Sequence, residues 1–167
     1  ILLAVTGLSP QIVTETLYAL AVGQATPWVP DEIHLITSCE GADRARLSLL
    51  DPGAGQFHAL CRDYPLLASA SFPPDNIHLI HDGSGQPLSD IRTPEDNALA
   101  ADTIHSVVRS LTADPDTELH VSIAGGRKTM GFYAGYALSL FGREQDRLSH
   151  VLVSAPFESS WEFFYPT

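Results

Sequence analysis

The stretch Glu118-Leu-His-Val-Ser-Ile-Ala124-Gly125-Gly126-Arg127-Lys128-Thr129 joins an apolar run to a loop that contains two adjacent glycines. The run from Glu118 to Ala124 is typical of a buried parallel strand, and residues 128–141 have the pattern of a helix. Two glycines allow the backbone to approach a ligand closely, and the free amides at the start of a helix attract anions. The stretch therefore predicts a strand, a phosphate-binding loop and a helix, in that order.

The rest of the chain repeats the alternation of strand and helix. Further apolar runs predict strands over residues 1–6, 32–37, 76–81 and 148–154. Between them we expect helices from Pro10 with Ser9 as the N-cap, over 43–50, over about 56–64, and over 93–111 with Thr93 as the cap. The alternation predicts an α/β fold of Rossmann-like type, an open and mainly parallel sheet with helices on both faces. We expect one domain over residues 1–167, closed by an aromatic-rich segment from about 155 to 167.

Composition excludes several classes of protein. A chain of 167 residues that is 44% hydrophobic can build one core without metals or disulfides. The net charge of −11 opposes binding along a long nucleic acid, which needs many cations to neutralise phosphates. Cys39 and Cys61 have no metal-ligand spacing, and no apolar run could span a membrane. We expect a cytoplasmic protein with free thiols, no membrane partner, no metal and no cofactor.

The histidines divide into two groups. His34, His78, His120 and His150 each fall at the expected start of a strand, far from the usual ligand crevice, so we assign them structural roles. His81 falls at the expected end of a strand and is the one histidine that merits a functional test.

In an open α/β sheet the loops at the carboxyl ends of the strands surround the ligand. Besides the loop 124–129, the first such loop, Gly7-Leu8-Ser9-Pro10-Gln11, supplies a hydroxyl, an amide side chain and a second helix start. Neither Gly-x-Gly-x-x-Gly nor Gly-x-x-x-x-Gly-Lys-Ser/Thr is present, which disfavours a dinucleotide dehydrogenase and a P-loop NTPase.

Four stretches carry a resemblance to a known family. Ala4-Val-Thr-Gly-Leu-Ser-Pro-Gln-Ile-Val-Thr-Glu-Thr-Leu-Tyr-Ala-Leu20, Asp90-Ile-Arg-Thr-Pro-Glu-Asp-Asn97, Ser122-Ile-Ala-Gly-Gly-Arg-Lys-Thr-Met130 and Ala137-Leu-Ser-Leu-Phe-Gly-Arg143 are similar to those of small CRISPR-associated proteins. These belong to the CRISPR-associated Rossmann fold (CARF) group. The group's usual motif after the fourth strand is Gly-Gly-Thr-Lys, and this chain departs from it with Arg127 at the third position.

The resemblance implies a homodimer that binds cyclic oligoadenylate, the second messenger of type III CRISPR defence, across its two-fold axis. Cyclic tetra-adenylate suits such a dimer, since it carries four phosphates and two-fold symmetry. The implied ligand-binding residues are Gly7, Leu8, Ser9, Gln11, Arg92, Gly125, Gly126, Arg127, Lys128 and Thr129. If the ring is cleaved, Lys128 and Arg127 would stabilise the developing charge, Ser9 would help to hold the ribose-phosphate, and Arg92 would cover the ligand from the segment 82–94.

Three functions remain open from the sequence. A ring nuclease would cleave the ligand without metal and end the signal. A sensor module would bind the intact ring and act on an effector, which could lie in a segment beyond Thr167. A more remote reading is a nucleotide-binding α/β protein of another pathway. No Arg-x-x-x-x-His motif or acidic nuclease cluster occurs in these residues, which favours the ring nuclease.

Overall fold

A computed structural model describes residues 1–167 and contains a five-stranded parallel sheet in the order β3-β2-β1-β4-β5. The strands are β1 (Leu2–Val5), β2 (Ile33–Thr37), β3 (Ile77–Leu79), β4 (His120–Ser122) and β5 (Arg147–Ser149). The α-helices are α1 (Gln11–Ala21), α2 (Cys39–Leu49), α3 (Gln56–Asp63), α4 (Pro94–Leu111) and α5 (Lys128–Phe141). The predicted Rossmann-like α/β fold is confirmed.

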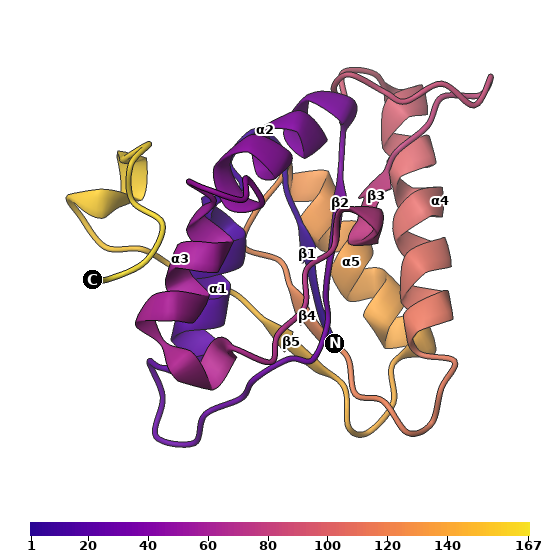
Figure 1. The fold of residues 1–167 in the computed structure, drawn as a ribbon. Helices are drawn as coiled ribbons and strands as arrows, with labels where there is room; N and C mark the ends of the chain where they lie inside the picture. Colours follow the sequence, from indigo (N-terminus) through magenta and orange to yellow (C-terminus); the bar gives the residue numbers. More distant parts are fainter.

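Helices cover both faces of the sheet (Figure 1). Helices α1, α2 and α3 pack on one face, where Leu2 and Ala4 of β1 lie in a cluster of 18 buried residues. Helices α4 and α5 pack on the other face, where Leu3 and Val5 lie in a second cluster of 13. Successive strand residues thus enter opposite cores, which explains why β1 is apolar throughout.

The strand order reverses between β1 and β4, which are parallel neighbours although they are far apart in the chain. Leu2 pairs with His120 on one side and with Ile33 on the other. The chain therefore leaves β1 toward one face of the sheet and leaves β4 toward the other. Such a switch point opens a crevice beyond the carboxyl ends of the two strands, and ligands of open α/β sheets bind there.

Two helix starts differ from their predictions. Helix α2 begins at Cys39, not at residue 43, because Ser38 caps it by accepting a hydrogen bond from the Gly41 amide. Helix α1 begins at Gln11, and Pro10 before it already has helical backbone angles, as predicted for a proline in the first turn. No side chain makes a cap hydrogen bond at this helix start, so the predicted capping bond from Ser9 is not formed.

The strand predicted over 148–154 is also wrong in its bounds. β5 spans only Arg147–Ser149 and ends level with Ser122, the last residue of its partner β4. Beyond it the chain runs as an irregular connection, and Val151 packs against the core on the α1 side.

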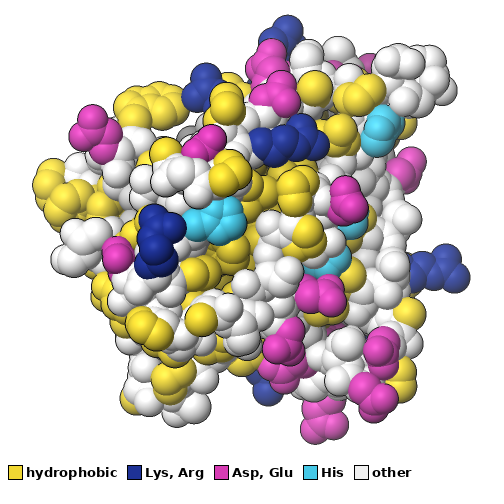
Figure 2. Space-filling model, in the orientation of Figure 1, with side chains coloured by type: hydrophobic (Ala, Val, Ile, Leu, Met, Phe, Trp, Pro, Cys, Tyr) yellow, Lys and Arg dark blue, Asp and Glu magenta, His cyan; other side chains and the backbone are white.

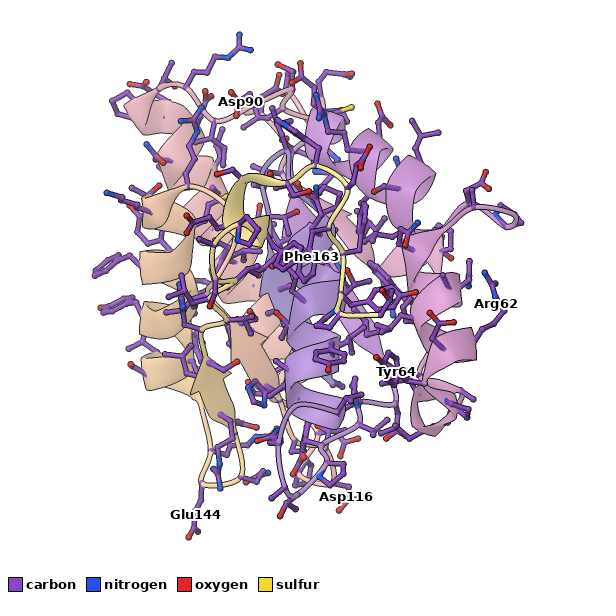
Figure 3. All side chains as sticks on the ribbon, turned by 90° about the vertical axis from the view of Figure 1, so that its left-hand side faces the viewer. Arg62, Tyr64, Asp90, Asp116, Glu144 and Phe163 are labelled. Atoms are coloured by element: carbon purple, nitrogen blue, oxygen red, sulfur yellow. The ribbon has the colours of Figure 1, made fainter.

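The C-terminal segment lies over the α1 side of the molecule, where Figure 3 labels Phe163 in front of that helix. A short 3-10 helix (Phe157–Ser159) begins it, and the Phe157 ring stacks on the Phe163 ring at 4.8 Å. Its end is tied to α3, since the Tyr165 hydroxyl donates to Asp63 at 2.9 Å. Tyr64 in turn donates to the Pro166 carbonyl at 2.8 Å.

No helix of the structure is both long enough and apolar enough to cross a lipid bilayer.

Candidate functional site

Two loops meet at the switch point and form a cradle of backbone. Gly125 comes shortly after β4 in the chain and packs tightly against the end of β1. A methyl group at Gly125 would lie 2.7 Å from the Val5 carbonyl oxygen. Gly126 has a φ of +77°, a conformation that favours glycine, and its neighbour across the gap is the first loop at Gly7. The two glycines are therefore required by the local geometry, and they leave the amides at the start of α5 open to a ligand.

Arg127 is held by a carboxylate from another strand exit. Its guanidinium donates to Asp90 at 3.0 Å, and Arg92 donates to the same carboxylate oxygen at 3.4 Å. Burial alone would raise the pKa of Asp90, but hydrogen bonds from the Ile91 amide and from Arg127 outweigh it and hold that pKa below its usual value. Asp90 is therefore an anion at neutral pH and fixes Arg127 at the edge of the cradle.

A cavity of about 660 Å³ lies on the α5 side of the loop. Arg127 and Lys128 line it, together with His150 from the end of β5 and with Phe132 and Tyr136 from α5. It combines two cations, an imidazole and aromatic surface, which is a lining suited to a phosphate-bearing ligand with rings.

A second cavity, of about 440 Å³, lies on the α1 side of the same loop. Ser9, Gln11 and Glu15 line it from the first loop and α1, Gly125 lines it from the glycine loop, and residues 157–161 close it. Burial raises the pKa of Glu15 to about 6. A third, smaller hollow of about 240 Å³ connects Gly7, Leu8 and Ser9 with Asp90, Gly126 and Arg127.

The structure thus brings most of the predicted residues around one loop. Those that line these three cavities are Gly7, Leu8, Ser9, Gln11, Gly125, Gly126, Arg127 and Lys128. Thr129 and Arg92 line none of them. The Thr129 hydroxyl instead donates to Asn97 at 2.8 Å and ties α5 to α4, while Arg92 pairs with Asp90.

The prediction for one histidine is wrong. His150 was expected at the start of a strand, but it follows the last residue of β5 and lines the cavity with Lys128. The error came from the bounds of β5, because a strand ending at Ser149 puts His150 at the carboxyl edge. The strand pattern Arg147-Leu-Ser149 is too short and polar to have revealed this.

The other histidines behave differently. His34 on β2 and His78 on β3 are hydrogen-bonded to each other at 2.9 Å, and burial lowers the pKa of His78. His120, at the start of β4, packs on the Trp28 ring at 4.9 Å. His81 is exposed, bridges to Pro87 and lines none of the cavities around the loop. No group of three or more His, Cys, Asp or Glu side chains is placed to hold a metal ion.

Charge is distributed unevenly over the molecule. Figure 2 shows one group of Asp and Glu side chains at the lower right of the face it draws, and further acidic side chains beside the Lys and Arg side chains in its upper part. In Figure 3 Asp90 marks the upper edge, where the cradle lies, and Asp116 and Glu144 mark the opposite edge. The few cations at the upper edge therefore act within an acidic protein, which restricts anion binding to places where they gather.

Comparison with known proteins bears on this site. No curated protein matches the chain. A family model does match it, over residues 9–167, and that range contains Ser9, Gln11, the glycine loop and His150. Because the match covers nearly the whole chain, the protein belongs to the family described as CRISPR-associated protein NE0113.

Proposed function

We propose that the protein binds cyclic oligoadenylate, with cyclic tetra-adenylate as the preferred ring, at the interface of a homodimer and cleaves it without metal as a ring nuclease. The observation that carries the proposal is the cradle at the β1–β4 switch point, where Gly125 and Gly126 precede Arg127 and Lys128 at the start of α5. An anion bound there would be attracted by the unpaired amides, the helix dipole and the two side-chain cations together. Membership of a CRISPR-associated family supports the same ligand.

The exposed face of α5 supports a two-fold arrangement. Phe132, Tyr136 and Leu140 recur every four residues on this helix and are 67%, 49% and 56% exposed. The rings of Phe132 and Tyr136 stack at 6.1 Å, and both line the cavity that contains Lys128. An apolar stripe of this kind marks an interaction surface. A second copy on it would place two cradles around one symmetric ring.

The proposed chemistry is an internal transfer. A ribose 2′-hydroxyl attacks the adjacent phosphorus, the bond from phosphorus to the 5′-oxygen breaks, and a 2′,3′-cyclic phosphate and a 5′-hydroxyl result. The proton of the 2′-hydroxyl leaves as the new bond forms, and the departing 5′-oxygen takes up a proton. The protein contributes by aligning these atoms and by stabilising negative charge on the phosphate oxygens.

The residues divide these tasks. Lys128 and Arg127 stabilise the charge, Ser9 positions the ribose-phosphate from the first loop, and Gln11 contacts the ligand beside it. His150 is added to this set, because it lines the same cavity as Lys128 and histidine is the side chain that most often serves as a general acid or base.

The test is to incubate the protein with cyclic tri-, tetra- and hexa-adenylate in EDTA and to resolve the products by chromatography. We expect linear products that end in a 2′,3′-cyclic phosphate, from the tetra-adenylate above all. Lys128→Ala should lower the cleavage rate roughly 10²–10³-fold. Arg109→Ala, which removes an exposed cation from the last turn of α4, is the matched control and should cleave as the wild type does.

Two outcomes would contradict the proposal in different ways. Tight binding of a ring that stays intact would replace the nuclease with a sensor of the same ligand. Failure to bind any of the three rings would reject the ligand itself.

A further inference from the structure

Gln11 is a buried side chain with an unpartnered atom. It is 9% exposed, and its Nε2 donates to the Trp161 carbonyl at 3.2 Å. Since a carbonyl can only accept, this bond fixes the orientation of the amide, and Oε1 is left as a buried oxygen without a hydrogen-bond partner. A buried acceptor without a donor is costly, and Gln11 is one of the residues that line the 440 Å³ cavity, where a ligand could supply that donor.

A second acceptor lies one helical turn further along. Gln11 and Glu15 are four residues apart on α1 and therefore share a face of the helix. Both line the 440 Å³ cavity on the α1 side of the glycine loop. Neither an arginine nor a lysine lines this cavity, so nothing in its wall competes as a cation for the two acceptors.

The remaining walls are suited to a flat ring. Ile12 contributes an apolar surface, and Phe157 and Trp161 belong to the C-terminal segment that closes the cavity. Its volume falls within the range of about 300–1,000 Å³ found for small-molecule sites. Ala124 and Gly125 form another part of the wall, so a group bound here lies directly beside the amides proposed to hold a phosphate.

We propose that this cavity is a nucleobase pocket that selects adenine, with the exocyclic amine of the base donating hydrogen bonds to Gln11 Oε1 and to the Glu15 carboxylate. The phosphate attached to that nucleoside lies on the loop 124–129. Hypoxanthine carries a carbonyl in place of the amine. Its carbonyl oxygen would face Gln11 Oε1 and the Glu15 carboxylate, which are also acceptors, so this base is rejected. This assignment rests on the proposed function. It adds that the adenines of the ring are recognised on the α1 side of the cradle.

The test compares cyclic tetra-adenylate with the same ring made from inosine, by isothermal titration calorimetry. The wild-type protein should bind the inosine ring at least about tenfold more weakly, because loss of the amine leaves buried acceptors unpaired. In Gln11→Ala and in Glu15→Ala the ratio between the two rings should fall toward one. Gln24→Ala, which truncates an exposed glutamine beyond the end of α1, is the matched control and should keep the wild-type ratio.

The ratio separates recognition from folding, because a variant that is merely destabilised binds both rings less well by the same factor. Equal binding of the two rings by the wild type would overturn the pocket, as would an unchanged ratio in both variants. If the wild type binds neither ring, the proposed function fails, and the pocket is tested alone with adenosine and inosine monophosphates at millimolar concentration. Lack of preference for the adenosine form would then overturn it as well.

Discussion

At the scale of single residues, Gly125 is the position with the least tolerance in the cradle. A methyl group there would meet the Val5 carbonyl oxygen at 2.7 Å and the Ile12 Cγ2 atom at 2.9 Å. Neither can move easily, since Val5 is in the central strand and Ile12 is buried in the core.

We therefore predict that Gly125→Ala lowers the free energy of unfolding by about 1–3 kcal/mol, the usual cost of overpacking. Gly7→Ala is the control in the facing loop, because its new methyl group would find its nearest neighbour only at 3.9 Å. Urea denaturation of both variants measures the difference. Equal stability of the two would show that β1 and the glycine loop are less tightly apposed than described.

Asp90 offers a second prediction at this scale. Its carboxylate pairs with Arg127 and adds a negative charge beside the proposed phosphate site. Asp90→Asn removes that charge and releases Arg127, so the affinity for cyclic tetra-adenylate should rise, by up to about fivefold at low salt.

Asp116→Asn is the control, because Figure 3 labels this carboxylate at the opposite edge of the molecule. Calorimetry at two salt concentrations measures both variants. A fall in affinity for Asp90→Asn would mean that the carboxylate serves mainly to orient Arg127.

At the scale of elements, α4 has the best-defined beginning. Thr93 accepts a hydrogen bond from the Asp96 amide at 3.1 Å, and the Asp96 carboxylate accepts one from the Thr93 amide at 3.1 Å. Thr93→Ala should cost about 1 kcal/mol of stability. Ser106→Ala, in an exposed position of the same helix, should change stability little. Thermal unfolding distinguishes them, and equal melting temperatures would show that the capping box contributes nothing.

The same helix shows what the sequence could predict. Thr93 and Pro94 form a local signal, and α4 begins where they place it, just as the Gly-Gly pair places α5. Helix α2 was predicted to begin four residues late, because Gly41 in its first turn weakens a helical pattern. The need for glycine at position 41 becomes visible only in the folded structure, because a methyl group there would lie 2.5 Å from the Gly7 carbonyl oxygen.

The site residues that could be predicted are those marked by a motif in the adjacent sequence. Arg127 and Lys128 could be placed because they follow the glycines directly in the chain. His150 could not, since its position depends on where pairing with β4 stops. The orphaned oxygen of Gln11 was equally hidden, because it depends on a hydrogen bond to a carbonyl 150 residues away.

At the scale of the whole molecule, the proposed dimer can be tested through α5. Phe132→Glu places a charge in the exposed apolar stripe and should shift the protein to a monomer in analytical ultracentrifugation. Leu47→Glu is the matched control, since Leu47 is 73% exposed on α2, which covers the other face of the sheet. If Phe132→Glu sediments as the wild type does, the stripe is not the dimer interface.

The two tryptophans give the molecule a built-in optical probe. Trp161 lies in the segment that closes the proposed base pocket, whereas Trp28 is hydrogen-bonded to Glu118 and packs on His120 at the amino ends of the strands. Emission from Trp161 should therefore respond when a ligand fills the cavity, while emission from Trp28 stays constant. The Trp28→Phe protein would carry a single tryptophan, at the site, and occupancy could then be followed in real time without labelling either the protein or the ring.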